Sequence, residues 1–447
     1  MAVTDCPTEE STAIRRAGLR LLPLLALLYF VSFLDRVNVG FGALTMNADM
    51  GLDARQFGFG AGIFFVGYIA FAVPANLMLK KAGASRWLAG IAIVWGAVAL
   101  LMAFVRTPAE FYLQRLLLGA TESGFLPGVM LYLTEWFPAR VIARVMASFF
   151  VAVPLSNVLG APLSSWLLNH GLWGMHGWQS MFLLEALPAI VLGVAATFWL
   201  DDEPCRASWL RPAERNALVA ALARDTGSSS ATSLRSGLMS PRVWGLGCIY
   251  FLIVMALYGF GFWAPQILRG IGGLSVQQTG WATAVPYCAA AASMVAWSAG
   301  SDRTGERTWH VVIPSFAGAL GFLIAGHAPS LWVAVAAFML STAGIYSACA
   351  VFWTMPRYIL SGTGAAAGIA LINSIGNLAG YFGPVTMGWL KGPAGGYSTG
   401  IDVLAMSMAA AGGLALVLGS DRSRGRRPPQ PSLLGMAWRR RRSPRAR

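Results

Sequence analysis

Four charged side chains stand inside stretches of sequence that are otherwise apolar. Asp35 and Arg36 are adjacent within LLALLYFVSFLDRVNVGFGAL, and Arg115 and Glu122 lie within FYLQRLLLGATESGFLPGVMLYL. If these stretches cross a membrane, each charge near the centre costs about 2.5–3.5 kcal/mol. Such residues are retained where they face an aqueous cavity, pair with one another or handle an ion. Fixed cations beside titratable carboxyls predict carboxylate binding with proton movement; the alternative is ion pairing that only holds helices together.

The spacing of Arg115 and Glu122 places both on one helix face. Seven residues make about two turns, so the two side chains are separated by about 10 Å along the axis. Arginine suits a carboxylate substrate because its planar fork matches two oxygens and keeps its charge. An anion bound to the arginine should favour proton uptake by the nearby acid, and the effect is reciprocal. We therefore expect Arg115 and Arg36 to bind substrate and Glu122 to carry a proton. Asp35 is a second carrier or a packing partner of Arg36.

The composition indicates that these residues are positioned by membrane helices. The chain has 447 residues, 56% hydrophobic and only 12% charged, whereas soluble domains carry about 25% charged residues. Twelve apolar segments are each long enough to cross a hydrocarbon core of about 30 Å; they fall near 19–44, 57–79, 86–106, 109–135, 144–168, 179–200, 243–268, 280–299, 309–327, 331–359, 366–390 and 401–419. The predicted fold is an all-α integral membrane protein whose twelve transmembrane helices form two pseudo-symmetric six-helix bundles.

The longest internal polar stretch divides the apolar segments six and six. Its middle, RPAERNALVAALARD, predicts a short amphipathic helix. Lys80 and Gly83 match Asp302 and Gly305 at a common offset, as in transporters built from two similar halves around a central site. The expected units are a cytoplasmic N-terminus (1–18), an N-terminal bundle (19–200), a central cytoplasmic loop (201–242), a C-terminal bundle (243–419) and a basic disordered tail (420–447).

The net charge of +14 describes membrane topology and does not indicate nucleic-acid binding. Apart from the two intramembrane arginines, the Lys and Arg residues expected outside the cytoplasmic face are few: Arg55, Arg106, Arg269 and Lys391. This asymmetry places both termini in the cytoplasm, and the basic tail would attract anionic lipids. The cysteines and histidines lack metal-ligand spacing, so we expect no metal, no cofactor and no enzymatic activity.

Several long stretches resemble the major facilitator superfamily, and within it the anion:cation symporter family. They are FLDRVNVGFGALTMNADMGL, FGFGAGIFFVGYIAFAVPANLMLKKAGASRW, RLLLGATESGFLPGVMLYLTEWFPAR and GAAAGIALINSIGNLAGYFGPVTMGWLK. Members of that family take up organic acids such as tartrate, hexonates, hexarates and aromatic acids. The resemblance implies a functional monomer, a bacterial inner-membrane location, and roles for Asp35 and Glu122 as proton carriers and for Arg36 and Arg115 as ligands of the substrate carboxylate.

The resemblance also implies cavity-lining and gating residues. Tyr68, Trp353 and Asn373 match cavity positions, although an aromatic residue on a membrane helix can equally be packing. The gating positions are Lys80, Lys81, Gly83, Arg86, Asp302, Arg303, Gly305 and Arg307. Lys80 departs from the superfamily pattern, which usually has Asp there, so the charge network of the first gate differs from that pattern.

The sequence thus predicts a proton-coupled symporter that imports a hydroxylated mono- or dicarboxylate by alternating access. Its partners would be that anion, protons and membrane lipids. Three alternatives remain. An exchanger or uniporter would use Asp35 and Glu122 only to tune affinity. A nutrient sensor of the same fold would need more cytoplasmic structure than the central loop and tail provide, and a membrane enzyme would need a catalytic constellation that the sequence does not suggest.

Overall fold

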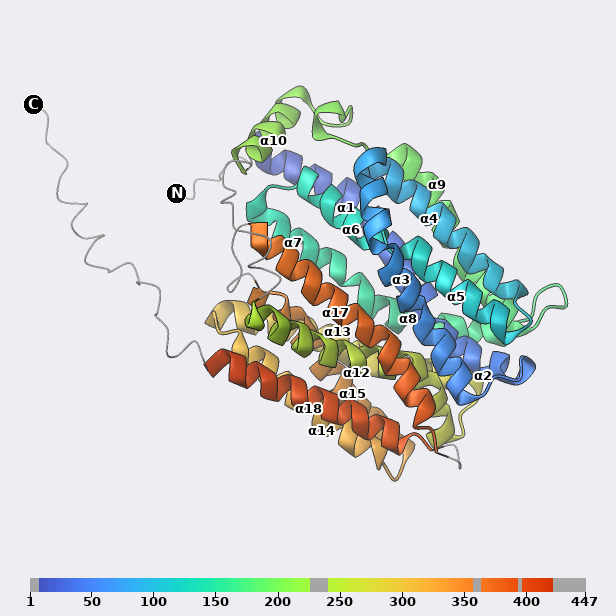
Figure 1. Ribbon diagram of the computed structural model, residues 1–447. Coiled ribbons are helices and arrows are strands. Elements are labelled where there is room, and N and C mark those ends of the chain that lie inside the picture. The colour runs from blue at the N-terminus through green and yellow to red at the C-terminus, as the bar shows by residue number, and fades with distance from the viewer. Residues whose placement is uncertain (1–7, 226–239, 357–362, 393–395, 421–447) are drawn as a thin grey trace, which may run out of the picture.

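The computed structural model describes residues 8–225, 240–356, 363–392 and 396–420. Its regular elements in these ranges are all helical and form two bundles (Figure 1). The N bundle contains α1 (Glu9–Val37), α2 (Val39–Asp49), α3 (Ala54–Ala82), α4 (Ala84–Leu100), η1 (Leu101–Phe104), α5 (Pro108–Glu122), α6 (Phe125–Trp136), α7 (Ala139–Phe150), α8 (Ala152–Leu168) and α9 (Gly177–Trp199). The C bundle contains α12 (Pro241–Gly272), α13 (Val276–Thr304), α14 (Thr308–Gly326), α15 (Leu331–Phe352), α17 (Thr363–Trp389) and α18 (Ser398–Ser420).

Helices occupy the positions of all twelve predicted spans. Within the described ranges, ten segments are long and apolar enough to cross a membrane: Glu9–Asp49, Ala54–Leu79, Ala84–Phe104, Pro108–Trp136, Ala139–Leu168, Gly177–Trp199, Pro241–Gly272, Thr308–Gly326, Leu331–Phe352 and Ser398–Gly419. The long helices α13 and α17 take the two remaining positions. The predicted all-helical membrane fold is confirmed. Helix α1 begins at Glu9 rather than near residue 19, and the span predicted at 109–135 is divided into α5 and α6.

The central segment places a short helix beside the N bundle. After η2 (Pro204–Arg206), α10 (Pro212–Asp225) packs on α1, as the pattern of its sequence predicted. Arg16 of α1 and the buried Glu214 of α10 form an ion pair of 2.9 Å. This end of the molecule, where α10 lies, is called the α10 end, and the opposite end is called the far end. The predicted tail lies outside the described residues from 421 onward.

Exposed tryptophans mark both ends of the bundles. Trp173 and Trp332 at the far end are 82% and 81% exposed, and Trp199, Trp244 and Trp309 are exposed at the α10 end. Indole rings favour the two interfaces between lipid and water. Their positions agree with bundles that cross a bilayer from one end to the other.

Corresponding helices of the two bundles begin and end in the same way. A capping box of Asp53 and Gln56 starts α3, and Ser275 and Gln278 start α13. A glycine at positive φ follows each helix: Gly83 (85°) and Gly305 (70°). In each case the second residue stands 222 positions after the first, so the internal repeat seen in the sequence is also a repeat of local structure.

The bundles approach each other most closely at the far end. A Cβ atom on Gly40 or on Gly58 would lie 2.6 Å from a backbone oxygen of the C bundle, that of Phe262 or of Pro384. Arg269 Nη1 also donates to the carbonyl of Leu44 across the interface, at 3.0 Å. At the α10 end, the ion pairs between described residues stay within one bundle or join α10 to the N bundle. The arrangement is therefore closed at the far end.

We expect Gly58→Ala to weaken this far-end closure. The added methyl group would meet the Pro384 carbonyl at 2.6 Å and the Gly388 Cα at 3.3 Å, and such overpacking costs about 1–3 kcal/mol. Distances between spin labels at cysteines replacing Ala48 and Trp332, in a background without native cysteines, should shift to longer values. Gly90→Ala is the control because no atom lies within 4 Å of its Cβ position; an unchanged distribution in Gly58→Ala would refute the closure.

Candidate functional site

Arg36 forms an ion pair within the N bundle and a hydrogen bond to the C bundle. Its Nη2 lies 2.6 Å from Glu122 Oε1, and its Nη1 donates to the hydroxyl of Tyr258 on α12, at 3.0 Å. The hydroxyl of Ser32, one turn earlier on α1, donates to the same oxygen of Glu122. All four side chains are buried, so the strength of this network depends on whether Glu122 is ionised.

Arg115 is a buried cation without a carboxylate partner in the described part of the chain. It is 1% exposed, its Nη2 donates to the carbonyl of Arg36 at 3.2 Å, and its Nε has no partner. The guanidinium carbon lies 5.1 Å from the ring centre of Phe64 and 5.9 Å from that of Phe262. Rings and one carbonyl compensate only part of the cost of burying a charge. The site therefore holds positive charge that an anion can neutralise.

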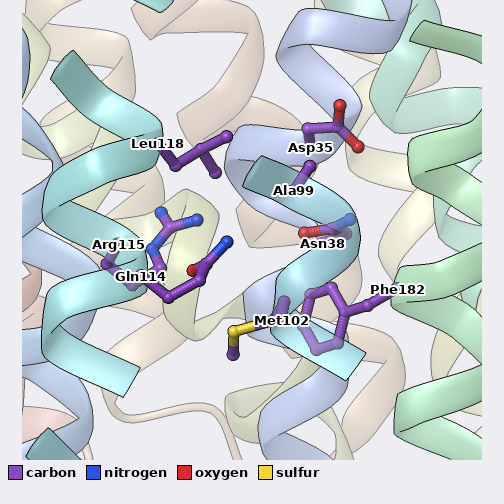
Figure 2. A pocket seen from close by; sticks show the side chains of 8 residues that line it. All are labelled: Asp35, Asn38, Ala99, Met102, Gln114, Arg115, Leu118 and Phe182. Atoms are coloured by element: carbon purple, nitrogen blue, oxygen red, sulfur yellow. The ribbon is translucent and has the colours of Figure 1, made fainter. Parts of the chain in front are cut away.

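Asp35 faces the interior of the N bundle, away from Arg36. Neighbouring residues on a helix point about 100° apart, so Arg36 reaches α5 and α12 while Asp35 reaches α4. Trp95 Nε1 donates to Asp35 Oδ2 at 3.2 Å. Figure 2 shows Asp35 and Asn38 on one side of a small polar pocket and Gln114 and Arg115 on the other.

Aromatic rings line the arginines and continue across the bundle interface. The Arg36 guanidinium carbon is 5.0 Å from the Phe64 ring and 5.4 Å from the Tyr68 ring. The ring of Phe65 meets that of Tyr258 at 4.6 Å. Of the three predicted cavity residues, Tyr68 is thus brought to the charged cluster.

The other two predicted cavity residues lie in the C bundle. Trp353 follows α15 and packs edge-on against Tyr250 at 4.8 Å, and Asn373 lies half-buried on α17. Tyr250 precedes Tyr258 on α12 by eight residues, which is about 12 Å toward the α10 end. Within the described residues, no hydrogen bond joins Trp353 or Asn373 to the four charges, so their role as substrate ligands stays a prediction.

The pairing of the charges differs from the pairing considered from the sequence. A simple Asp35–Arg36 pair is wrong, because adjacent helical residues diverge. The carboxylate of Glu122 pairs with Arg36 of α1 and, among the described residues, forms no ion pair with Arg115 of its own helix. Tyr258, which sequence reasoning missed, carried a signal: it stands 222 residues after Arg36, the offset of the internal repeat.

The second gating segment forms a compact charged turn at the α10 end. Arg307 Nη1 lies 2.7 Å from Asp302 Oδ1 and donates to Ser301 Oγ at 2.8 Å. Partial burial favours a higher pKa for Glu306, but hydrogen bonds from the backbone N–H of Trp309 and from His310 outweigh it, so the pKa of Glu306 lies below its usual range. Its carboxylate therefore stays ionised at neutral pH and holds the start of α14.

The first gating segment obtains its acid from outside the motif. Asp202 Oδ1 accepts from Ser85 N at 3.2 Å and from Ser85 Oγ at 2.6 Å, beside Gly83. A carboxylate thus stands at this turn even though Lys80 replaces the usual acid. Lys81, Arg86 and Arg303 are exposed, and the side chain of Lys80 lies outside the described part.

Comparison with known proteins places the chain among transporters. The sequence model of the Major Facilitator Superfamily matches residues 25–384. A putative tartrate transporter of Agrobacterium vitis is 48% identical over 412 residues, 92% of each chain. The putative metabolite transport protein NicT of Pseudomonas putida is 42% identical over 83% of this chain and 86% of its own. A solved bacterial homologue of the human lysosomal transporter Spinster shares the fold, with a TM-score of 0.71 at 15% identity over 90% of this chain and 95% of that chain.

Proposed function

This chain belongs to the major facilitator superfamily, and on that premise we propose that it imports a small organic anion together with protons. The proposal rests on the charges at the bundle interface: of two buried guanidinium groups, only one forms an ion pair with a carboxylate of the described residues. Arg36 has Glu122 as its partner, and Arg115 forms no ion pair with a carboxylate of the described residues. Such a site favours an anion as its ligand.

The substrate carboxylate would bind Arg115 and compete with Glu122 for Arg36. Arginine can hold a carboxylate through two parallel hydrogen bonds, and two carboxylates in one buried site disfavour each other's ionisation. Glu122 would therefore leave Arg36 and take up a proton as the substrate binds. Because the linkage is reciprocal, proton binding also favours the anion.

The change of partner at Arg36 would also allow the two bundles to move relative to each other. Arg36 donates both to Glu122 and to Tyr258, so a change in its partner alters a hydrogen bond that crosses between the bundles. The far-end contacts would then separate while the α10 end closes, and the gating positions Lys80, Lys81, Gly83, Arg86, Asp302, Arg303, Gly305 and Arg307 would form the contacts of that closure.

The charges and the relatives support the proposed substrate class. A relative that is 48% identical is named as a putative tartrate transporter. This name supports a hydroxylated mono- or dicarboxylate as the substrate. Arg36, Arg115, Tyr68, Trp353 and Asn373 would contact it, with Asp35 as a second proton carrier. The protein would act as a monomer in a bacterial inner membrane, with the basic α10 end and both termini in the cytoplasm.

Proton flux in proteoliposomes tests this function. The purified protein would be reconstituted with a pH dye inside, and tartrate, hexonates, hexarates and aromatic acids would be added one at a time. We expect internal acidification with one class of acid and none in protein-free vesicles. If radiolabelled acid exchanges without any acidification, the protein is an exchanger and not a symporter. If no acid of the panel gives a signal in either assay, organic-anion transport is refuted.

A further inference from the structure

A second polar cluster lies inside the N bundle, apart from the arginine–glutamate pair. Glu185 on α9 is 2% exposed. Its Oε2 accepts from Asn38 Nδ2 at 2.9 Å and its Oε1 accepts from Ser164 Oγ at 2.6 Å. Within the described residues, Glu185 forms no ion pair with a cation. A buried carboxyl held only by neutral donors is costly as an anion, so Glu185 has reason to bind a proton.

The small pocket of Figure 2 connects this cluster to Asp35. The buried atoms Asp35 Oδ1, Asn38 Oδ1 and Gln114 Oε1 all lack partners, and their side chains line the pocket. The amide orientations are set elsewhere, because Asn38 Nδ2 donates to Glu185 and Gln114 Nε2 donates to the Val98 carbonyl at 3.1 Å. These three residues and Arg115 line a space with room for about one water molecule. The three oxygens can therefore accept from an N–H of Arg115, from a water or from a protonated carboxyl.

We propose that Asp35 and Glu185 share one proton and that Asn38 couples their protonation. In the arrangement observed, Asn38 Nδ2 donates to Glu185 Oε2. This hydrogen bond fits an ionised Glu185, and the Asn38 oxygen would then accept from a protonated Asp35, directly or through a water. When Glu185 is protonated instead, the Asn38 amide turns over: its oxygen accepts from Glu185, and its NH₂ group donates toward an ionised Asp35. One carboxyl gains a proton as the other loses one, so the total number of protons is unchanged.

The surrounding charges favour such sharing. Asp35 and Glu185 are both buried, and two nearby buried carboxyls resist simultaneous ionisation. The buried charged groups on the packed elements are Arg36 on α1 and Arg115 and Glu122 on α5. The other charged residues of these elements are not buried: Glu9, Glu10, Arg15, Arg16 and Arg20 on α1, Glu110 on α5 and Asp49 at the end of α2. Helix α8 carries none, and the only charged residue of α4, Arg86, is exposed at the α10 end. Arg115 thus places positive charge near Asp35, whereas no cation of the described residues pairs with Glu185.

The shared proton would give the transporter a second proton site, distinct from Glu122. This role in transport rests on the proposed symport, but the sharing itself does not. It can be measured on the purified protein without substrate, so failure of proton-coupled uptake and failure of proton sharing are separate outcomes.

Infrared difference spectroscopy across a pH titration tests the sharing. We expect a carbonyl band of protonated carboxyl to persist to higher pH in the wild type than in either Glu185→Gln or Asp35→Asn. Each variant removes the negative neighbour that holds the last proton, so the band should disappear about one pH unit or more lower. Asn38→Leu removes the amide that links the two carboxyls. We expect the titration curve of this variant to differ from that of the wild type and from those of Glu185→Gln and Asp35→Asn.

Controls separate coupling from simple burial. Glu9→Gln removes an exposed carboxylate of the same helix α1 and should leave the buried band unchanged. Loss of the band in Asp35→Asn with no shift in Glu185→Gln would mean that Asp35 titrates alone, and a band unaffected by pH in every variant would mean a permanently protonated structural acid. Either result overturns the proposal. If one variant does not fold, the other still reports on the remaining carboxyl.

Discussion

Arg115→Gln is expected to abolish saturable transport at substrate concentrations that saturate the wild type. Arg115 has one carbonyl partner and two aromatic neighbours, so most of its hydrogen-bonding capacity is free for a substrate carboxylate. Truncating one partner of a buried, hydrogen-bonded charge pair costs about 2–5 kcal/mol, which corresponds to a loss of affinity of about 30-fold to several thousand-fold. Substrate-induced quenching of tryptophan fluorescence in detergent would measure the affinity directly.

The matched control is Arg106→Gln, which removes an exposed arginine immediately before the same helix. It should leave the affinity within about twofold, since exposed charges contribute little. Arg115→Lys keeps the charge but loses the planar fork, and we expect an intermediate loss. Wild-type affinity in Arg115→Gln would show that the anion binds elsewhere and would leave the uncompensated guanidinium as a packing feature.

The types and the burial of the charged residues could be predicted from the sequence, but their partners could not. A charged residue inside an apolar run indicates a functional or paired site, because burying a charge in a membrane costs free energy in whichever direction the side chain points. Partners depend on helix rotation, and sequence reasoning compared residues that are close in the chain. Arg36 and Glu122 are 86 positions apart, and their contact requires α1 to lie beside the junction of α5 and α6, which no local pattern specifies.

The polar residues around Asp35 escaped prediction for a related reason. Asn38, Ser164 and Trp95 are individually unremarkable in membrane helices, where interhelical hydrogen bonds are common. Only the contact of Glu185 with Asn38 places this carboxyl beside Asp35. Pseudo-symmetry is the one long-range signal that the sequence did contain: the 222-residue offset joins Gly83 to Gly305 in local structure and Arg36 to Tyr258 in space.

Glu122→Gln is expected to convert coupled uptake into exchange. The substitution keeps the size of the side chain and an oxygen that can accept from Ser32, but it removes the proton site and the ion pair with Arg36. For a monocarboxylate carried with one proton, the wild type should accumulate substrate about tenfold per unit of pH gradient. Glu122→Gln should reach no accumulation, while exchange of labelled for unlabelled substrate continues and binding loses its dependence on pH.

The reason is that the carboxylate of Glu122 competes with the substrate for Arg36 only while it is ionised. Without that competitor, the anion binds whether or not protons are available, so the gradient no longer drives uptake. Glu110→Gln is the matched control on the same helix, since glutamine preserves its cap at Thr107; it should retain accumulation. If Glu122→Gln still accumulates substrate along a pH gradient, the coupled proton must be carried elsewhere, and Asp35, with its own buried network, would be the group to replace next.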